Sequence, residues 1–166
     1  MKNNSARLST SYSLFMLLLF AVHTNSYGQQ KRMEKVQALY DSLRLYEIEN
    51  PQTVLATAIV ETGWMECKDC SLEMNNLFGF RLTKGYVQFR NISECLAYMK
   101  NWQAAFYRPW KAKHPHSSYY EFLNYVKYAA NMPDYIKYVK NMERWVSHNL
   151  KSEEPEPDFS YAYRFH

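Results

Sequence analysis

The sequence predicts a mainly α-helical (α+β) domain with a small β element. Three observations lead to this fold class. Apolar residues recur at helical spacing over most of the chain, capping residues and prolines stand at the expected helix starts, and an alternating pattern typical of a strand occurs over 86–90. The 166 residues are sufficient for one compact domain.

The first helices are predicted from apolar spacing and from Pro51. A helix is expected over 31–48, and a second from Pro51 to near Gly63, because proline favours the first helical turn. The residue composition and pattern change over 64–92, and this segment is expected to form a loop followed by a small β-hairpin or a single irregular strand.

Capping signals define the remaining helices. Asn91 with Glu94, and Ser118 with Glu121, have the spacing of capping boxes. We expect a third helix over 92–107 that Pro109 breaks, then a loop over 111–117. A fourth helix should run from Ser118 to about residue 130, and a fifth should begin at 133–134 and extend to 146. Residues 151–166 are expected to form a flexible C-terminal tail.

The first 28 residues are predicted to be an export signal. Lys2 and Arg7 give a basic start, and 14–22 is an apolar run of nine residues, shorter than the roughly 20 that span a membrane. Small residues precede a candidate cleavage site at Gln29. We therefore expect a protein of the periplasm or extracellular space, with no stable membrane span after signal removal. A buried N-terminal helix is the alternative.

The composition is typical of a folded globular protein and argues against several functional classes. Hydrophobic residues make up 47% of the chain and charged residues 22%, unlike a disordered protein. The net charge of +4 is too small and too evenly distributed for a dedicated nucleic-acid-binding protein. Aromatic residues reach 17%, with 15 Tyr, and tyrosine-rich surfaces suit flat, half-polar ligands such as sugars.

Three cysteines, Cys67, Cys70 and Cys95, give an odd count. Export permits a disulfide, and Cys67 and Cys70 are a close pair, so a disulfide or free thiols are the favoured interpretations. A zinc half-site would need a second pair of ligands, and a redox motif would need a surrounding βαβ pattern. The sequence shows neither, and we predict no metal site.

Glu61 is the polar residue that stands out in the second predicted helix. Ala58 and Val54 precede it by three and seven residues, so Glu61 shares the buried stripe of that helix. Burial and the negative end of the helix dipole both raise the pKa of a carboxyl group. A carboxyl group that is protonated near neutral pH can donate a proton to a leaving oxygen, as a glycosidase requires. The alternative is a glutamate that reaches solvent or pairs with a cation.

Amide and aromatic side chains gather in two further clusters. Asn75 and Asn76 precede Phe78, and amides beside aromatic rings can bind sugar hydroxyl and N-acetyl groups while the rings stack on the sugar. An ordinary turn is the alternative, because Asn and Gly favour turns. Tyr128 and Tyr135 flank a break at 131–133, and tyrosines at helical spacing more often belong to the core.

Three motifs combine these clusters. They are Ala-Ile-Val-Glu-Thr-Gly-Trp at 58–64, Asn-Asn-Leu-Phe-Gly-Phe at 75–80 and Tyr-Ala-Ala-Asn-Met-Pro-Asp-Tyr at 128–135. In this order they resemble the peptidoglycan-cleaving glucosaminidases of glycoside hydrolase family 73, over residues 51–146. The third motif is one residue longer than the family's usual Tyr-Ala-x-Asp-Pro-x-Tyr and has Asn131 at the acidic place.

The resemblance implies a lysozyme-like helical fold with a small, shortened β-lobe, formed here by a catalytic domain over 29–150. It implies hydrolysis of the β-1,4 bond after N-acetylglucosamine in peptidoglycan glycan strands, without a metal or organic cofactor. Glu61 falls on the family's general acid and Tyr135 on its active-site tyrosine. The expected substrate-binding residues are Trp64, Asn75, Asn76, Phe78 and Tyr128.

One departure from the family concerns the second carboxylate that many relatives carry in the β-lobe. Residues 80–92 contain no Asp or Glu, which favours a mechanism in which the substrate's own 2-acetamido group is the nucleophile. Two alternatives stay open: a lytic transglycosylase, which also works with a single glutamate, and a glycan-binding module that has lost catalysis.

Overall fold

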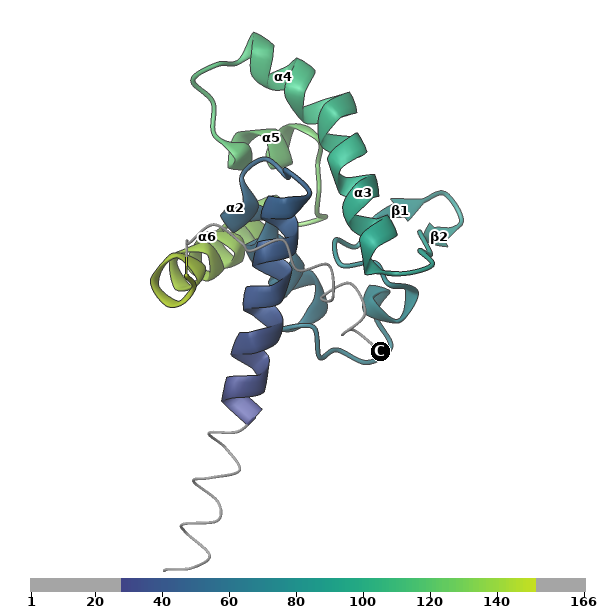
Figure 1. Ribbon diagram of the computed structural model, residues 1–166. Coiled ribbons are helices and arrows are strands. Elements are labelled where there is room, and N and C mark those ends of the chain that lie inside the picture. Colours follow the sequence, from purple (N-terminus) through teal and green to yellow (C-terminus); the bar gives the residue numbers. More distant parts are fainter. Residues whose placement is uncertain (1–27, 152–166) are drawn as a thin grey trace, which may run out of the picture. The chain divides into compact units, whose positions relative to one another are not determined.

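The computed structural model describes residues 28–151 (Figure 1). All but the last residue of the predicted export signal (1–28), and all but the first residue of the predicted tail (151–166), lie outside the described residues. Packing divides the chain between Lys35 and Val36. Residues 28–35, the described part of the first unit, are helical.

The predicted mainly α-helical fold with a small β element is confirmed. A helix over 28–45 is followed by α2 (Pro51–Thr62), the short 3₁₀ helix η1 (Ser71–Met74), strands β1 (Arg81–Leu82) and β2 (Gly85–Tyr86), α3 (Ile92–Trp102), the π-helical turn η2 (Gln103–Tyr107), α4 (Arg108–Lys113), α5 (Tyr119–Tyr125) and α6 (Met132–Asn149).

Helix α2 is the buried core element of the second unit. Residues 53–59 are all buried, and α2 packs most extensively against α6. Pro51 occupies its first turn, where the missing N–H costs nothing. Gly63 ends it in a left-handed conformation and donates its N–H to the Ile59 carbonyl, which satisfies one of the free carbonyls at the helix end.

The predicted break at Pro109 is wrong. Segments α3, η2 and α4 follow one another as one helical rod (Figure 1), with Pro109 in the first turn of α4. In η2 the N–H of Arg108 donates to the Gln103 carbonyl, five residues back. In a regular α-helix the proline ring would clash with the carbonyl four residues back and leave that carbonyl without a donor. The wider turn shifts the carbonyls before Pro109, so the helix continues through the proline.

The strand expected over 86–90 is shorter than predicted. Strands β1 and β2 pair antiparallel over two residues each. Beyond them, the N–H groups of Val87 and Phe89 donate to the carbonyls of Phe80 and Met74, in the segment that precedes the hairpin. These bonds hold 87–89 against the preceding loop.

The two predicted capping sites are present at the starts of α3 and α5. The Asn91 side chain accepts the N–H of Glu94, and Ser118 forms a full capping box with Glu121. Helix α5 ends at Tyr125, earlier than expected, because Lys127 adopts a left-handed conformation with φ 51°.

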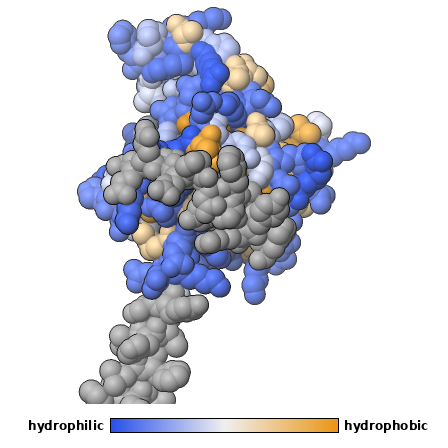
Figure 2. Space-filling model, in the orientation of Figure 1, coloured by the Kyte–Doolittle hydropathy of each residue, from blue (hydrophilic) through white to orange (hydrophobic). Residues whose placement is uncertain are grey.

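Exposed apolar residues are scattered in the described part of the chain. The face in Figure 2 is mostly hydrophilic, with small and separate hydrophobic areas. Among the helices within 28–151, none combines the length and apolar character needed to cross a bilayer.

Asn76 fastens the β element to the core. Its side chain is fully buried, and its amide nitrogen donates to the carbonyls of Phe80 (2.8 Å) and Val87 (3.0 Å). Its amide oxygen accepts the N–H of Phe80 at 3.0 Å. One side chain therefore bonds both ends of the hairpin.

We expect Asn76→Ala to lower the free energy of unfolding by about 3 kcal/mol, because it leaves buried backbone groups without partners. Asn101→Ala, at an exposed position of α3, is the control and should change stability by about 0.5 kcal/mol or less. Denaturant unfolding measures both. Equal stability of the two variants would show that Asn76 does not anchor the hairpin.

Candidate active site

Glu61 lies in the last turn of α2 and is partly buried. Burial raises the pKa of its carboxyl group, and the nearby Tyr135 hydroxyl acts in the opposite direction. Burial disfavours the charged form because the side chain loses hydrating water. The sequence-based expectation of a raised pKa at this position therefore agrees with the structure.

Gly79 lies directly against the Glu61 carboxyl group. A Cβ atom at Gly79 would stand 2.6 Å from Glu61 Oε2 and 3.2 Å from its carboxyl carbon, so the carboxyl group would have to move to make room for a side chain there. Gly79 also has φ +63°, a left-handed conformation that favours glycine. The loop before β1 can approach Glu61 this closely because residue 79 has no side chain.

Tyr135 reaches the same place from α6. Its hydroxyl is buried among the Glu61 carboxyl group and the Thr57 hydroxyl, without a hydrogen bond of regular geometry. Burial and the nearby Glu61 carboxylate raise the pKa of Tyr135 far above its ordinary value, so the phenol stays protonated. Thr57 lies one turn before Glu61 on the same face of α2.

Tyr128 joins the third motif to the second. Its hydroxyl donates to the Phe78 carbonyl at 2.6 Å, and its ring centroid lies 5.7 Å from that of Tyr135. Burial, Tyr135 and Glu61 all raise the pKa of Tyr128. The structure thus brings together residues from all three motifs around one carboxyl group.

The other predicted substrate-binding residues make contacts within the protein itself. Asn76 has a structural role in place of the predicted sugar contact, because its amide is fully buried and engaged with the hairpin backbone. Asn75 donates to the Phe89 carbonyl at 3.0 Å. Phe78 is almost fully buried, and Trp64 packs edge-on against Trp145 with centroids 4.7 Å apart.

A groove of about 490 Å³ opens beside Gly79. Its walls come from 78–81, from α3 and η2, and from 126–128. Phe80 and Trp102 line it with ring centroids 5.8 Å apart. A second groove of about 550 Å³ shares Lys127 and Tyr128 with it. An aromatic groove of this size can hold a sugar residue.

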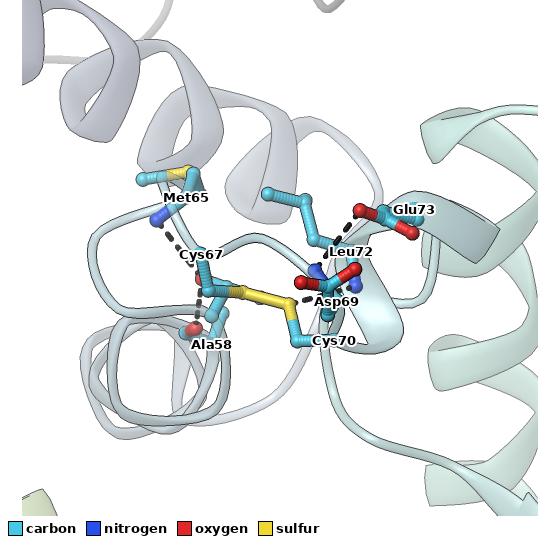
Figure 3. The surroundings of a disulfide bond; sticks show 8 residues. Ala58, Met65, Cys67, Asp69, Cys70, Leu72 and Glu73 are labelled. Carbon is cyan, nitrogen blue, oxygen red and sulfur yellow. Dashed lines mark hydrogen bonds between the residues drawn. A yellow bond between two sulfur atoms is a disulfide. The ribbon is translucent and has the colours of Figure 1, made fainter.

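The loop after α2 is closed by a disulfide between Cys67 and Cys70 (Figure 3). The N–H of Leu72 donates to the Cys70 sulfur at 3.4 Å. Cys95 is a free, buried thiol, and burial raises its pKa to about 12. The close pair is thus oxidised, and the third cysteine belongs to the core.

The other carboxylates of this region are engaged elsewhere or exposed. Glu73 accepts the N–H of Asp69 at 2.9 Å. Glu94 accepts the N–H of Arg90 and pairs with its guanidinium at 3.2 Å, and these bonds lower the pKa of Glu94. Glu66 is exposed.

Glu143 on α6 is a partly buried carboxylate that the sequence did not single out. It accepts hydrogen bonds from the hydroxyls of Thr53 (2.6 Å) and Tyr120. Thr53 lies eight residues before Glu61 in α2, about 12 Å along the helix axis. Glu143 therefore lies near the opposite end of α2 from the candidate site.

Comparisons with models of known protein families, with curated proteins and with solved structures gave no match. Thr57 and Gly79 are the site residues that sequence reasoning missed. The signal for Gly79 was its place in the second motif, although nothing in the sequence shows that it faces Glu61.

We expect Gly79→Ala to displace the Glu61 carboxyl group toward solvent and to bring its pKa closer to the ordinary value. The strained φ should also lower the free energy of unfolding by about 1–2 kcal/mol. Titration of the Glu61 side-chain carboxyl by NMR measures the first effect, and denaturant unfolding the second.

Gly85→Ala is the matched control for this variant. Gly85 also has a positive φ (+128°), but nothing lies within 4 Å of a Cβ there. It should lose stability while the pKa of Glu61 stays raised. An unchanged Glu61 pKa in Gly79→Ala would show that the close contact does not set the environment of the carboxyl group.

Proposed function

We propose that this protein is an exported peptidoglycan hydrolase that cleaves the β-1,4 glycosidic bond after N-acetylglucosamine. The observation that carries the proposal is the partly buried Glu61 carboxyl group, which lies between Gly79 and Tyr135. Gly79 also lines an aromatic groove. The proposal rests on this arrangement together with the resemblance of the three motifs.

In the proposed reaction Glu61 is the general acid. Its raised pKa keeps a fraction of the carboxyl group protonated above the ordinary range of a glutamic acid. The proton passes to the glycosidic oxygen as the bond to the sugar C1 breaks. Tyr135 keeps its own proton at neutral pH, so it can donate a hydrogen bond to the Glu61 carboxylate that forms when the proton leaves.

The nucleophile in this scheme is the carbonyl oxygen of the substrate's 2-acetamido group. Between α2 and the first turn of α3, the carboxylates are exposed or bonded to the backbone or to Arg90. Glu143 on α6 is engaged by the hydroxyls of Thr53 and Tyr120 near the opposite end of α2. Attack of the acetamido oxygen on C1 forms an oxazolinium ion while the leaving sugar takes the proton from Glu61. Water then adds to C1 and returns a proton to Glu61, which restores the acid.

A lytic transglycosylase is the second candidate, and the same single carboxylate favours it. Such an enzyme uses the muramyl 6-hydroxyl in place of water and leaves a 1,6-anhydro end. Analysis of the products distinguishes the two reactions, because the glucosaminidase leaves a reducing N-acetylglucosamine. A glycan-binding module without catalysis would give neither product.

We expect Glu61→Gln to abolish clearing of cell-wall sacculi in a zymogram, with a loss of at least about 100-fold in rate. For the wild-type protein, kcat/KM should fall on the alkaline side as the pH rises through the raised pKa of Glu61, because the proton donor is lost. Clearing by wild type and Glu61→Gln alike would contradict the assigned role.

A stability measurement shows whether the variant is folded. Glu61 binds its proton more tightly in the folded state, so its contribution to stability is complete below pH 4.5 and decreases as the pH rises through the folded pKa. Glu61→Gln should therefore unfold no more easily than wild type at neutral pH. A lower melting temperature there would mean that lost activity reflects lost structure.

We further expect Glu66→Gln, Asp69→Asn, Glu73→Gln and Glu94→Gln each to keep activity within about tenfold of wild type, because the acetamido group replaces a second carboxylate. The assay is release of reducing ends from purified glycan. A loss at any one of these positions comparable to that of Glu61→Gln would identify a second catalytic carboxylate and refute the substrate-assisted scheme.

A further inference from the structure

The groove beside Gly79 combines aromatic walls with positive charge. Trp102 and Phe106 form part of one wall, and Arg81 and Lys127 are its charged lining residues. No carboxylate is among its lining residues, all of which lie within the described chain. The hairpin side is basic as a whole, because 80–92 contains Arg81, Lys84 and Arg90 but no acidic residue.

Arg81 and Lys127 differ from the cations that serve the fold. Arg90, Lys100 and Arg108 each pair with a glutamate, at 3.2, 2.7 and 2.5 Å. Within residues 28–151, neither Arg81 nor Lys127 has such an ion pair. The Arg81 guanidinium lies 4.4 Å from the centroid of the Tyr86 ring, a cation–π contact that does not neutralise its charge.

Lys127 occupies a backbone position that favours glycine. It has φ 51° in the turn between α5 and α6, and it lines both this groove and its neighbour. A lysine in this conformation costs conformational energy that a glycine would not. The lysine side chain thus supplies a positive charge to both grooves, although the backbone of Lys127 is strained.

We propose that this groove binds the acidic peptide that peptidoglycan strands carry on muramic acid, through its carboxylates to Lys127 and Arg81. This inference rests on the proposed function and specifies its substrate class as peptide-bearing glycan. Gly79 lines the groove and contacts the Glu61 carboxyl group. The muramic acid on the leaving side of the cleaved bond, and the peptide attached to it, would therefore lie in reach of the groove.

Charge and shape both fit this occupant. The stem peptide of peptidoglycan carries several carboxylates on a flexible chain, which complement two cations at one groove. Its aliphatic parts can pack on Trp102 and on Phe106, which is 55% exposed. Arginine and lysine in a partly enclosed groove bind carboxylates more strongly than they do on an open surface.

The test compares peptide-bearing glycan strands with the same strands after an amidase has removed the peptides. We expect Lys127→Gly and Arg81→Gln each to raise KM for peptide-bearing strands by about threefold to tenfold, with kcat retained. Much smaller changes are expected on the peptide-free strands. Lys127→Gly suits the left-handed φ, so its melting temperature should not fall below that of wild type.

Lys84→Gln is the matched control, because it removes one charge from the exposed turn of the hairpin without lining the groove. Its KM should stay within about twofold of wild type. If Arg81→Gln and Lys127→Gly behave like Lys84→Gln, or weaken both substrates equally, the groove does not recognise the peptide, while the hydrolase proposal stands.

A binding experiment covers the case in which wild type cleaves no glycan. Calorimetric titration with a free stem tetrapeptide, and with its amidated form lacking carboxylates, measures the groove alone. Binding of the acidic form that Lys127→Gly and Arg81→Gln weaken supports the inference even if the hydrolase proposal fails. Absence of binding to wild type, or equal binding of the amidated form, overturns it.

Discussion

The contact between the Glu61 carboxyl group and the backbone of Gly79 is the constraint on which the candidate site depends. It requires the loop before β1 to pass close to the Glu61 side chain at the end of α2. Asn76 meets this requirement on the loop side by bonding the hairpin backbone, and Tyr128 adds a bond to the Phe78 carbonyl. The polar groups of the second motif therefore hold the wall of the site in place.

Local signals made much of the fold predictable from the sequence. Pro51 and Gly63 mark the ends of α2 as observed, and the Ser118 capping box begins α5, because caps act within a few residues of chain. Pro109 shows the limit of such reasoning. A proline normally ends a helix, but the π turn before it accommodates the ring, and nothing local in the sequence announces that turn.

The candidate site was predictable in part, for a similar reason. The burial of Glu61 follows from periodicity along one helix, and its raised pKa follows from burial. The orientation of Asn76 does not follow, because an amide beside a turn can face a ligand or the backbone, and only the path of the hairpin decides between them. Gly79 meets Glu61 across a loop, a pairing that no local pattern encodes.

The π turn also determines how the aromatic rings are arranged along the rod. Tyr98, Trp102 and Phe106 are spaced by four residues, and in a regular α-helix each such step advances about 40° around the axis. The wider turn covers only the step from Trp102 to Phe106, where it offsets part of that rotation, and these two rings, with centroids 5.9 Å apart, line the same groove. A linear chain lying in this groove would meet both rings in succession, whereas Tyr98 packs against Phe80 and Phe89.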